Sequence, residues 1–319
     1  MQRVEQILVP LDFSSFGRCA LALAAKLGSS PEKLGDSAHL QLAHAVEAMP
    51  PYVRSVLFPY APLGEDDRQF EAEIAEAVRQ EMEHYFELDD HLGERFIDEP
   101  AVEFGAAARW LRRWESHYDV DLIVMGASGE GGAWPGGPGS TSRRTAELAS
   151  HPVILVRDYE PDPTVGRILV AVDLGEGALD VLEAAVGLAA DLNAQLEVLH
   201  VVPSPFANDT RGLVSRQIEV DQEALMRSAE AIIEGHLEQL KAKAELPEEV
   251  EKHVFEAVVR WGDPAREIGA RTEEGEFDLV VIGRGTSGGL GRVCAAVVAE
   301  VPRHLMVVPV GCEGTVLAG

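Results

Sequence analysis

The feature of this sequence that most restricts its fold is an internal repeat. Residues 7–12 form an apolar run that ends in an aspartate, and residues 168–173 form another run of the same kind. A second strand-like segment, residues 39–46, returns as residues 195–202. Because similar segments occur in the same order in each half of the 319 residues, we expect two copies of one domain.

The later segments repeat as well. A short strand ends at Gly105 in the first half and at Gly262 in the second, and a further apolar strand ends at Gly126 and at Gly283. The spacing between the two glycines is the same in both halves. Repeats that agree in spacing as well as in type indicate equivalent structural elements rather than a chance similarity.

Helical segments separate these strands, and a fifth strand closes each half, at residues 152–156 and 305–309. The sequence of each half therefore predicts strands and helices in the order β-α-β-α-β-α-β-α-β. Short, wholly apolar runs that alternate with helices are typical of buried parallel strands. We therefore expect an α/β fold in which each half is a doubly wound parallel sheet with helices on both faces.

A long acidic helix is predicted after the second strand of each half, because apolar residues recur there at helical spacing. In the first half these residues are Phe70, Ile74, Ala77, Val78 and Tyr85. In the second half they are Ile218, Leu225, Ile232, Leu237 and Leu240. We expect each set to form a buried stripe.

The segment 159–163 reads as the linker between the halves, because its two prolines stiffen the chain and cannot join the interior of a sheet. The sequence therefore predicts one domain at residues 1–158 and another at residues 166–319.

The charge balance is strongly acidic. Lys and Arg number 27 against 54 for Asp and Glu, which gives a formal net charge of −27. Such a field repels phosphate backbones and anionic headgroups, so it disfavours nucleic-acid and membrane-surface roles. An acidic surface keeps a protein soluble, and it is also suited to a salty cytoplasm, where salt screens its self-repulsion. The sequence does not distinguish between these two explanations.

The N-terminus lacks the apolar core of a signal peptide, and no apolar run approaches the roughly 18 residues of a membrane-spanning helix. The three cysteines have no zinc-site or disulfide spacing; Cys19 and Cys294 lie in apolar helical segments and are expected to pack, and Cys312 lies in the C-terminal tail. We therefore expect a cytoplasmic protein.

A ligand of an open parallel sheet binds beyond the carboxyl ends of the strands, where the strand order reverses. In the first half Asp12 lies there; it can accept hydrogen bonds from a ligand, or it can cap the next helix. The glycine-rich loop 126–140 follows the fourth strand. Its backbone can approach an anion closely, and the helix that begins at Gly139 and Ser140 offers unpaired N–H groups, although a plain surface loop is the alternative.

Two further features near this site have structural explanations that we favour. Arg143 and Arg144 could offset phosphate charge, but a solvated helix face explains them better. His44 and His200 occupy equivalent places in the two halves, and a repeated histidine is more often bonded to a backbone group than catalytic.

No catalytic or metal-binding constellation stands out. There is no nucleophile–base–acid set, no Walker lysine in the GxxxxGK[ST] spacing, and no HExxH or paired CxxC metal motif. We therefore name no catalytic residue and no metal ligand, and expect at most slow hydrolysis of a bound nucleotide.

The loop of the first half carries a recognisable signature. Gly126, Gly129 and the pair Gly139–Ser140 fit the pattern G-x2-G-x9-G-S/T, which resembles the nucleotide-binding signature of the universal stress protein family. The first strand of both halves, with its final aspartate, resembles that family. So do the strand that ends at Gly126, the closing strand 152–156 and, in the second half, Gly262-Asp263-Pro264. The resemblance covers nearly the whole chain, once per half.

The resemblance implies a Rossmann-like fold of the adenine-nucleotide alpha-hydrolase type with strand order 3-2-1-4-5. It also implies pairing through the fifth strands, so that the two halves imitate the family's dimer within one chain, and it allows a homodimer of chains. The implied ligand is ATP or AMP, with or without Mg. Carried over by position, the implied contacts are Asp12 and the backbone of Ala45 or Val46 for the adenosine, and Gly126, Gly129, Gly139 and Ser140 for the phosphates.

Both halves depart from the pattern. The first-half insert 130–138 has no basic residue, which predicts weak phosphate affinity. In the second half Gly283 is kept, but Thr286 stands where Gly129 would align, and Ala296–Val297 replaces Gly139–Ser140. A side chain at Ala296 would narrow the anion's approach, so we expect a degenerate second site.

Three functions are compatible with these patterns. We favour a nucleotide-binding protein with a regulatory role in the stress response. A scaffold or interaction module with vestigial sites is the first alternative. An adenylating enzyme of a related fold is the second, but that class needs a phosphate loop after the first strand, and residues 13–17 contain one glycine and no basic residue.

Overall fold

A computed structural model gives the fold. It describes residues 4–28, 38–46, 65–87, 99–129, 137–157, 163–203, 221–242, 253–285 and 289–311.

The described part of the first half contains five strands and four helices in the order that the sequence predicts. They are β1 (Gln6–Pro10), α1 (Ser15–Leu27), β2 (His39–Val46), α3 (Glu65–Glu87), β3 (Ala101–Phe104), α4 (Ala107–His117), β4 (Leu122–Gly126), α5 (Ser140–Leu148) and β5 (Val153–Val156).

The second half repeats this order. Its elements are β6 (Arg167–Val172), α6 (Ala178–Leu192), β7 (Gln195–Pro203), α7 (Gln222–Ala242), β8 (Val254–Gly262), α9 (Pro264–Glu274), β9 (Leu279–Arg284), α10 (Gly291–Glu300) and β10 (His304–Pro309).

The strands of both halves join in one ten-stranded sheet with the order β3-β2-β1-β4-β5-β10-β9-β6-β7-β8. Each half is parallel and has the expected order 3-2-1-4-5. The halves meet where β5 and β10 pair antiparallel, with Ile154 opposite Met306. The expected pairing through the fifth strands is therefore confirmed. Without it β5 and β10 would be sheet edges, and with it each strand has a partner within the chain.

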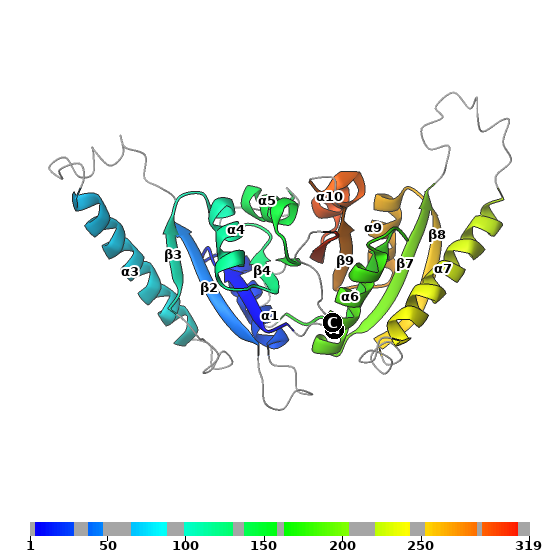
Figure 1. The fold of residues 1–319 in the computed structure, drawn as a ribbon, viewed down its shortest axis with the longest axis horizontal. Coiled ribbons are helices and arrows are strands. Elements are labelled where there is room, and N and C mark those ends of the chain that lie inside the picture. Colours follow the sequence, from blue (N-terminus) through cyan, green and yellow to red (C-terminus); the bar gives the residue numbers. More distant parts are fainter. Residues whose placement is uncertain are drawn as a thin grey trace, which may run out of the picture.

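Helices cover both faces of the sheet (Figure 1). One core layer contains residues of α1, α3, α6 and α7, and the other contains residues of α4, α5, α9 and α10. The long helices α3 and α7 lie at the two outer ends of the molecule, and α5 and α10 lie near its centre (Figure 1). Because each layer runs through both halves, the doubly wound α/β architecture extends across the whole molecule.

A repeated aspartate fixes the start of the first strand in each half. Asp121, just before β4, accepts hydrogen bonds from the backbone N–H groups of Glu5 and Gln6 at 2.8 and 2.9 Å. Asp278, just before β9, does the same for Gly166 and Arg167. Hydrogen bonds to a carboxylate are stronger than bonds between neutral groups, so these contacts hold neighbouring strands in register at the end opposite the candidate site.

The buried stripe predicted for the second long helix is wrong in part. Leu225 and Ile232 are 42% and 44% exposed, whereas Ala229, Ile233 and Leu240 are buried. Leu225 and Ile232 lie seven residues apart and share one face of α7, but the sheet contacts the adjacent face. Ile218 lies outside the described residues.

The linker expected at 159–163 is described only at its last residue. The carbonyl of Pro163 accepts a hydrogen bond from Lys26 Nζ at 2.8 Å, which holds the start of the second half against the end of α1. The domain limits 1–158 and 166–319 stay a prediction.

Candidate ligand-binding sites

The strand order reverses between β1 and β4 in the first half and between β6 and β9 in the second. The carboxyl ends of these strands form the place where open α/β sheets bind ligands. Asp12 and Gly126 lie there in the first half, and Asp173 and Gly283 lie there in the second. The fold therefore contains two equivalent candidate sites.

The Asp12 carboxylate supports the start of α1 without capping it. Its Oδ1 accepts hydrogen bonds from the backbone N–H and the hydroxyl of Ser14, at 3.1 and 2.6 Å. Ser14 is the N-cap residue, and its Oγ accepts the N–H of Gly17 at 3.1 Å. The capping role considered for Asp12 thus belongs to Ser14, and the Oδ2 side of Asp12 faces the loop after β4.

That loop returns to Asp12 at its first turn. A Cβ on Gly129 would lie 3.0 Å from Asp12 Oδ2, so a side chain there would crowd the carboxylate. Residues 130–136 of the loop, including Trp134, lie outside the described residues. The described parts therefore bring together Asp12 and Gly129, two residues to which the resemblance assigns ligand contacts.

The start of α5 is tied to the end of β4. The N–H of Gly139 donates to the carbonyl of Ala127 at 2.7 Å, and the Ser142 hydroxyl donates to the same carbonyl at 2.6 Å. Gly139 is the N-cap residue of α5 and has no side chain to cap the helix. The first-turn N–H groups of a helix have no acceptor within it, so those of Ser140 and its neighbours are suited to an anion.

The other predicted contacts lie at the end of β2. Ala45 and Val46 pair with Glu103 and Phe104 of β3. The carbonyl of Val46 accepts the N–H of Gly105 at 2.8 Å, so sheet pairing already uses it. Any ligand contact of Val46 must therefore share that carbonyl or use another backbone group.

The two repeated histidines have the backbone partners that we favoured. His44 Nδ1 lies 2.6 Å from the carbonyl of Leu11, and His200 Nδ1 lies 2.7 Å from the carbonyl of Val172. A carbonyl accepts only, so Nδ1 carries the proton in both rings. Each histidine therefore fastens the second strand of its half to the end of the first.

Arg143 and Arg144 form the solvated face that we expected. Both are more than half exposed, and both lie near the Glu147 carboxylate, at 3.6 and 3.0 Å. Their charge is offset on α5 itself.

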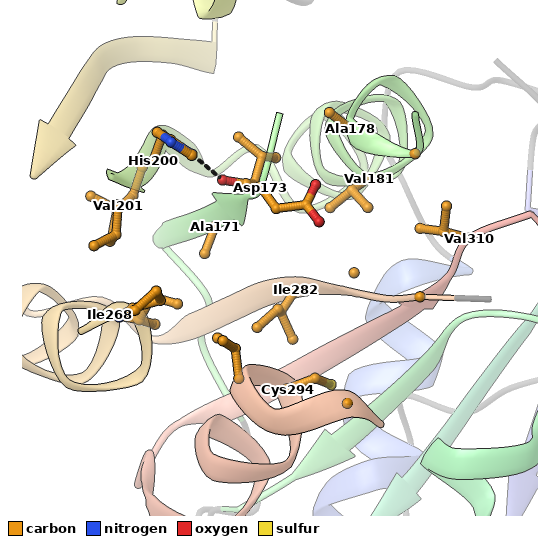
Figure 2. Close-up of a pocket in the computed structure, with 18 of the residues that line it drawn as sticks. Ala171, Asp173, Ala178, Val181, His200, Val201, Ile268, Ile282, Cys294 and Val310 are labelled. Carbon is orange, nitrogen blue, oxygen red and sulfur yellow. Dashed lines mark hydrogen bonds between the residues drawn. The ribbon is translucent and has the colours of Figure 1, made fainter. Parts of the chain in front are cut away.

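A cavity of about 690 Å³ lies at the second site. Figure 2 shows apolar side chains of β9, α9 and β7 around it, with Asp173 and Val181 on one side and Cys294 of α10 on another. Such a volume is typical of small-molecule pockets, which span roughly 300–1,000 Å³.

The expected alignment of the second site is wrong. Ala296 and Val297 lie inside α10 and not at its start, which is Gly291. Val153 and Leu305 hold equivalent positions in the closing strands, and Gly139 and Gly291 each lie 14 residues before them. The second half therefore has a glycine where the first half has Gly139.

The misalignment comes from loop length. Gly126 and Gly139 are 13 residues apart, whereas Gly283 and Gly291 are 8 apart, so the second loop is five residues shorter. Counting back from the closing strand would have found Gly291. The same count assigns Arg292 to the place of Ser140 and Cys294 to the place of Ser142.

Sequence reasoning also missed Ser142 and Ser14, which hold the loop and helix termini at the first site. Their signal is a serine within the first turn of a helix or just before it, the position at which a hydroxyl satisfies backbone groups. At the second site it missed Glu176 and Asp180, which line the cavity.

Among the described residues that line the second cavity, Cys294 has a pKa that departs clearly from its ordinary value. Burial raises the pKa of its thiol from 9.0 to about 12, because the apolar surroundings disfavour the thiolate. The expectation that Cys19 and Cys294 pack in the interior is confirmed, since both are buried. Cys312 lies outside the described residues.

Within the described ranges, no helix is long and apolar enough to cross a membrane. In the same part of the chain, no three His, Cys, Asp or Glu side chains gather in a group that could hold a metal ion.

The fold and its two switch points define a tandem α/β protein with two candidate sites at equivalent places in its halves. The sequence model of the Universal stress protein family matches residues 3–157 and again residues 164–309. The chain belongs to the universal stress protein family, as a member with two tandem domains.

Solved structures agree with this architecture. A universal stress protein from Archaeoglobus fulgidus DSM 4304 is 18% identical over 97% of this chain and 99% of its own, with a TM-score of 0.63. A putative universal stress protein from Pseudomonas aeruginosa UCBPP-PA14 is 16% identical over 97% of this chain and 94% of its own, with a TM-score of 0.57. A search of curated protein sequences finds no significant match. At these identities the structures support the fold alone.

Proposed function

We propose that the chain binds an adenine nucleotide, ATP or AMP with or without Mg, in its first half, and acts in the cytoplasm as a regulatory protein of the stress response. The approach of Gly129 to Asp12 is the observation that carries this proposal. Gly129 belongs to the glycine pattern that resembles the family's nucleotide signature, and Asp12 ends the first strand, which resembles that family as well. The two residues come from segments more than a hundred residues apart.

The two ends of the site suit the two ends of a nucleotide. The N-terminus of α5 has a positive helix-dipole end and unpaired N–H groups, which favour phosphate. Asp12 is negative and would repel a phosphate, but it can accept hydrogen bonds from the ribose hydroxyls or from an exocyclic amine. The backbone of Ala45 or Val46 would then contact the adenine.

Gly139 is the residue best suited to test this arrangement. A Cβ there would lie 3.5 Å from its nearest neighbour, the Ser142 hydroxyl, so the protein itself has room for a side chain. A phosphate held by the first-turn amides of α5 would not leave that room. Gly139→Val should therefore weaken ATP binding by tenfold or more, which is about 1.4 kcal/mol per factor of ten.

The test is equilibrium dialysis of the full chain with ATP and with AMP, before and after Gly139→Val. Gly235→Val is the control, because a Cβ on Gly235 of α7 meets nothing within 4 Å and lies on an outer helix. Thermal unfolding verifies that both variants fold. We expect one ATP site per chain, lost in Gly139→Val and kept in the control.

Other outcomes would decide against the proposal. No binding of either nucleotide at millimolar concentration would favour the scaffold with vestigial sites. Release of pyrophosphate with an acceptor would favour an adenylating enzyme. Two equal ATP sites per chain would refute the assignment of the ligand to the first half. Pairing of two chains as a homodimer is a separate part of the proposal, which sedimentation of the full chain tests.

A further inference from the structure

The cavity of the second half combines apolar walls with a group of carboxylates. Its walls are largely apolar and include Leu199, Val201, Ile268, Ile282 and Leu290. Among the described residues, the charged groups that line it are three carboxylates and one arginine, namely Asp173, Glu176, Asp180 and Arg292.

The arginine does not balance these carboxylates. The guanidinium of Arg292 lies 3.6 Å from a further carboxylate, that of Asp263, and its side chain is mostly exposed. Solvent and Asp263 therefore offset much of its charge. The described lining of the cavity therefore carries an excess of negative charge.

The extra carboxylates come from a longer connection between the first strand and the first helix of this half. Phe16 packs against Gly126, and Val181 packs against Gly283 in the same place. Phe16 follows Asp12 by four residues, whereas Val181 follows Asp173 by eight. The added residues start α6 earlier and include Glu176, while the short first-half connection, residues 13–15, is uncharged.

At the start of α10, other side chains stand where the first site has two serine hydroxyls. Arg292 stands in the place of Ser140, and Cys294 stands in the place of Ser142. A buried, protonated thiol is a weak hydrogen-bond donor. The two serine hydroxyls are thus replaced at these positions, and carboxylates that repel an anion are added, whereas solvent and Asp263 offset much of the charge of Arg292.

We propose that the second cavity binds a small organic molecule with an apolar body and a positively charged end, and that it excludes ligands that carry phosphate. The apolar walls bury the body, and Glu176 and Asp180 attract the cation at the mouth. This inference concerns the second half alone and does not require a nucleotide in the first.

A charge series on one scaffold tests the proposal. The probes are 5′-amino-5′-deoxyadenosine, adenosine and AMP, which place a cation, a neutral group and an anion at the same atom. Calorimetric titration uses the full chain with Gly129→Val, because a side chain there crowds Asp12 and blocks the first site. We expect the amine to bind at least ten times more tightly than AMP, with adenosine between them, and the ratio to shrink with added salt.

Two further variants locate the effect. In the same background, Glu176→Gln with Asp180→Asn should reduce the preference for the amine to less than threefold. Glu223→Gln with Glu230→Gln is the matched control, since it makes the same change in net charge on the outer helix α7 and should leave the preference unchanged. Ala171→Leu, which fills the cavity floor, should abolish binding of the amine, with folding verified by thermal unfolding.

The proposal is overturned if AMP binds as tightly as the amine, if the amine fails to bind at millimolar concentration, or if both charge variants have the same effect. Failure here leaves the first-half assignment intact, because that assignment is measured by ATP binding with Gly129 unchanged. Loss of ATP binding in the first half would in turn leave the charge series unaffected.

Discussion

Gly126 and Gly139 both belong to the signature, but the structure requires a glycine only at the first of these positions. A Cβ on Gly126 would lie 2.9 Å from the Cβ of Phe16 and 3.0 Å from the backbone N of Gly17, so the packing of β4 against α1 requires a glycine. Gly139 has no such neighbour, and its φ of −61° is open to any residue. Packing therefore explains Gly126 without a ligand but does not explain Gly139, which makes Gly139 the more informative residue.

Cys294 should make the stability of the protein depend on alkaline pH. Burial raises its pKa to about 12, so the folded chain keeps a proton that the unfolded chain loses near pH 9. Stability is unaffected below that range and falls as the pH rises toward 12. At about 1.4 kcal/mol per pH unit, the thiol should cost about 2 kcal/mol between pH 9.0 and 10.5.

Urea unfolding of the wild-type chain and of Cys294→Ala between pH 8 and 10.5 measures this cost. The variant loses the titrating group, so the gap between the two free energies of unfolding should narrow or reverse as the pH rises. Cys19 is the same in both proteins and cancels. Parallel pH profiles would show that the thiol ionises as easily in the folded chain as in the unfolded one.

At the scale of elements, one carboxylate joins two helices and a strand in the first half. Glu115 of α4 is buried and accepts the backbone N–H groups of Ser150 and His151 at 2.8 and 3.1 Å. These residues connect α5 to β5. Glu115→Ala would leave two N–H groups without their acceptor, which should cost about 2 kcal/mol of stability.

The measurement is the free energy of unfolding in urea. Glu115→Gln keeps an acceptor oxygen and should lose less than Glu115→Ala. Thr272 holds the equivalent place in α9, but its hydroxyl bonds to Ile268 of the same helix at 2.7 Å. Thr272→Val is therefore the matched control, and it should lower the free energy of unfolding less than Glu115→Ala does. An equal decrease in both variants would mean that the hydrogen bonds from Glu115 to Ser150 and His151 contribute little.

The elements themselves could be predicted from sequence, and the lengths of their connections could not. The strands could be located because each is a largely apolar run that recurs in the other half. Their order in the sheet came from the family resemblance. Ala296 was misaligned because a fixed offset assumed equal loops, and loops tolerate insertions that strands do not. The longer connection before Val181 was missed for the same reason, and with it the carboxylates of the second cavity.

At the scale of the whole molecule, the two halves meet as a dimer would. Ile154 and Met306 are equivalent in sequence and lie opposite each other, so a pseudo-twofold axis passes between them. Two arginines strengthen this junction. Arg157 donates to the carbonyls of Val298 and Val301 at the end of α10, and Arg284 donates to those of Glu147 and Ala149 at the end of α5.

Each arginine therefore caps the C-terminus of a helix in the other half, where the helix dipole favours a positive charge by up to about 2 kcal/mol in partly buried geometries. Burial lowers the pKa of Arg157 to about 10, which still leaves it charged at neutral pH. Because α5 and α10 begin at the two candidate sites, each arginine holds the far end of a helix that starts at the site of the other half. The halves should consequently unfold together.

Replacing both arginines should separate the unfolding of the two halves. Three of the four tryptophans lie in the first half, so in a Trp261→Phe background fluorescence reports that half alone, whereas far-ultraviolet circular dichroism reports both. The two urea transitions should coincide in this background and diverge after Arg157→Met with Arg284→Met. Arg144→Met with Arg227→Met removes two exposed arginines that pair with glutamates of their own helices, and it should leave the transitions together. Coincident transitions in the first double variant would mean that the β5–β10 pairing and the shared core layers couple the halves without the arginines.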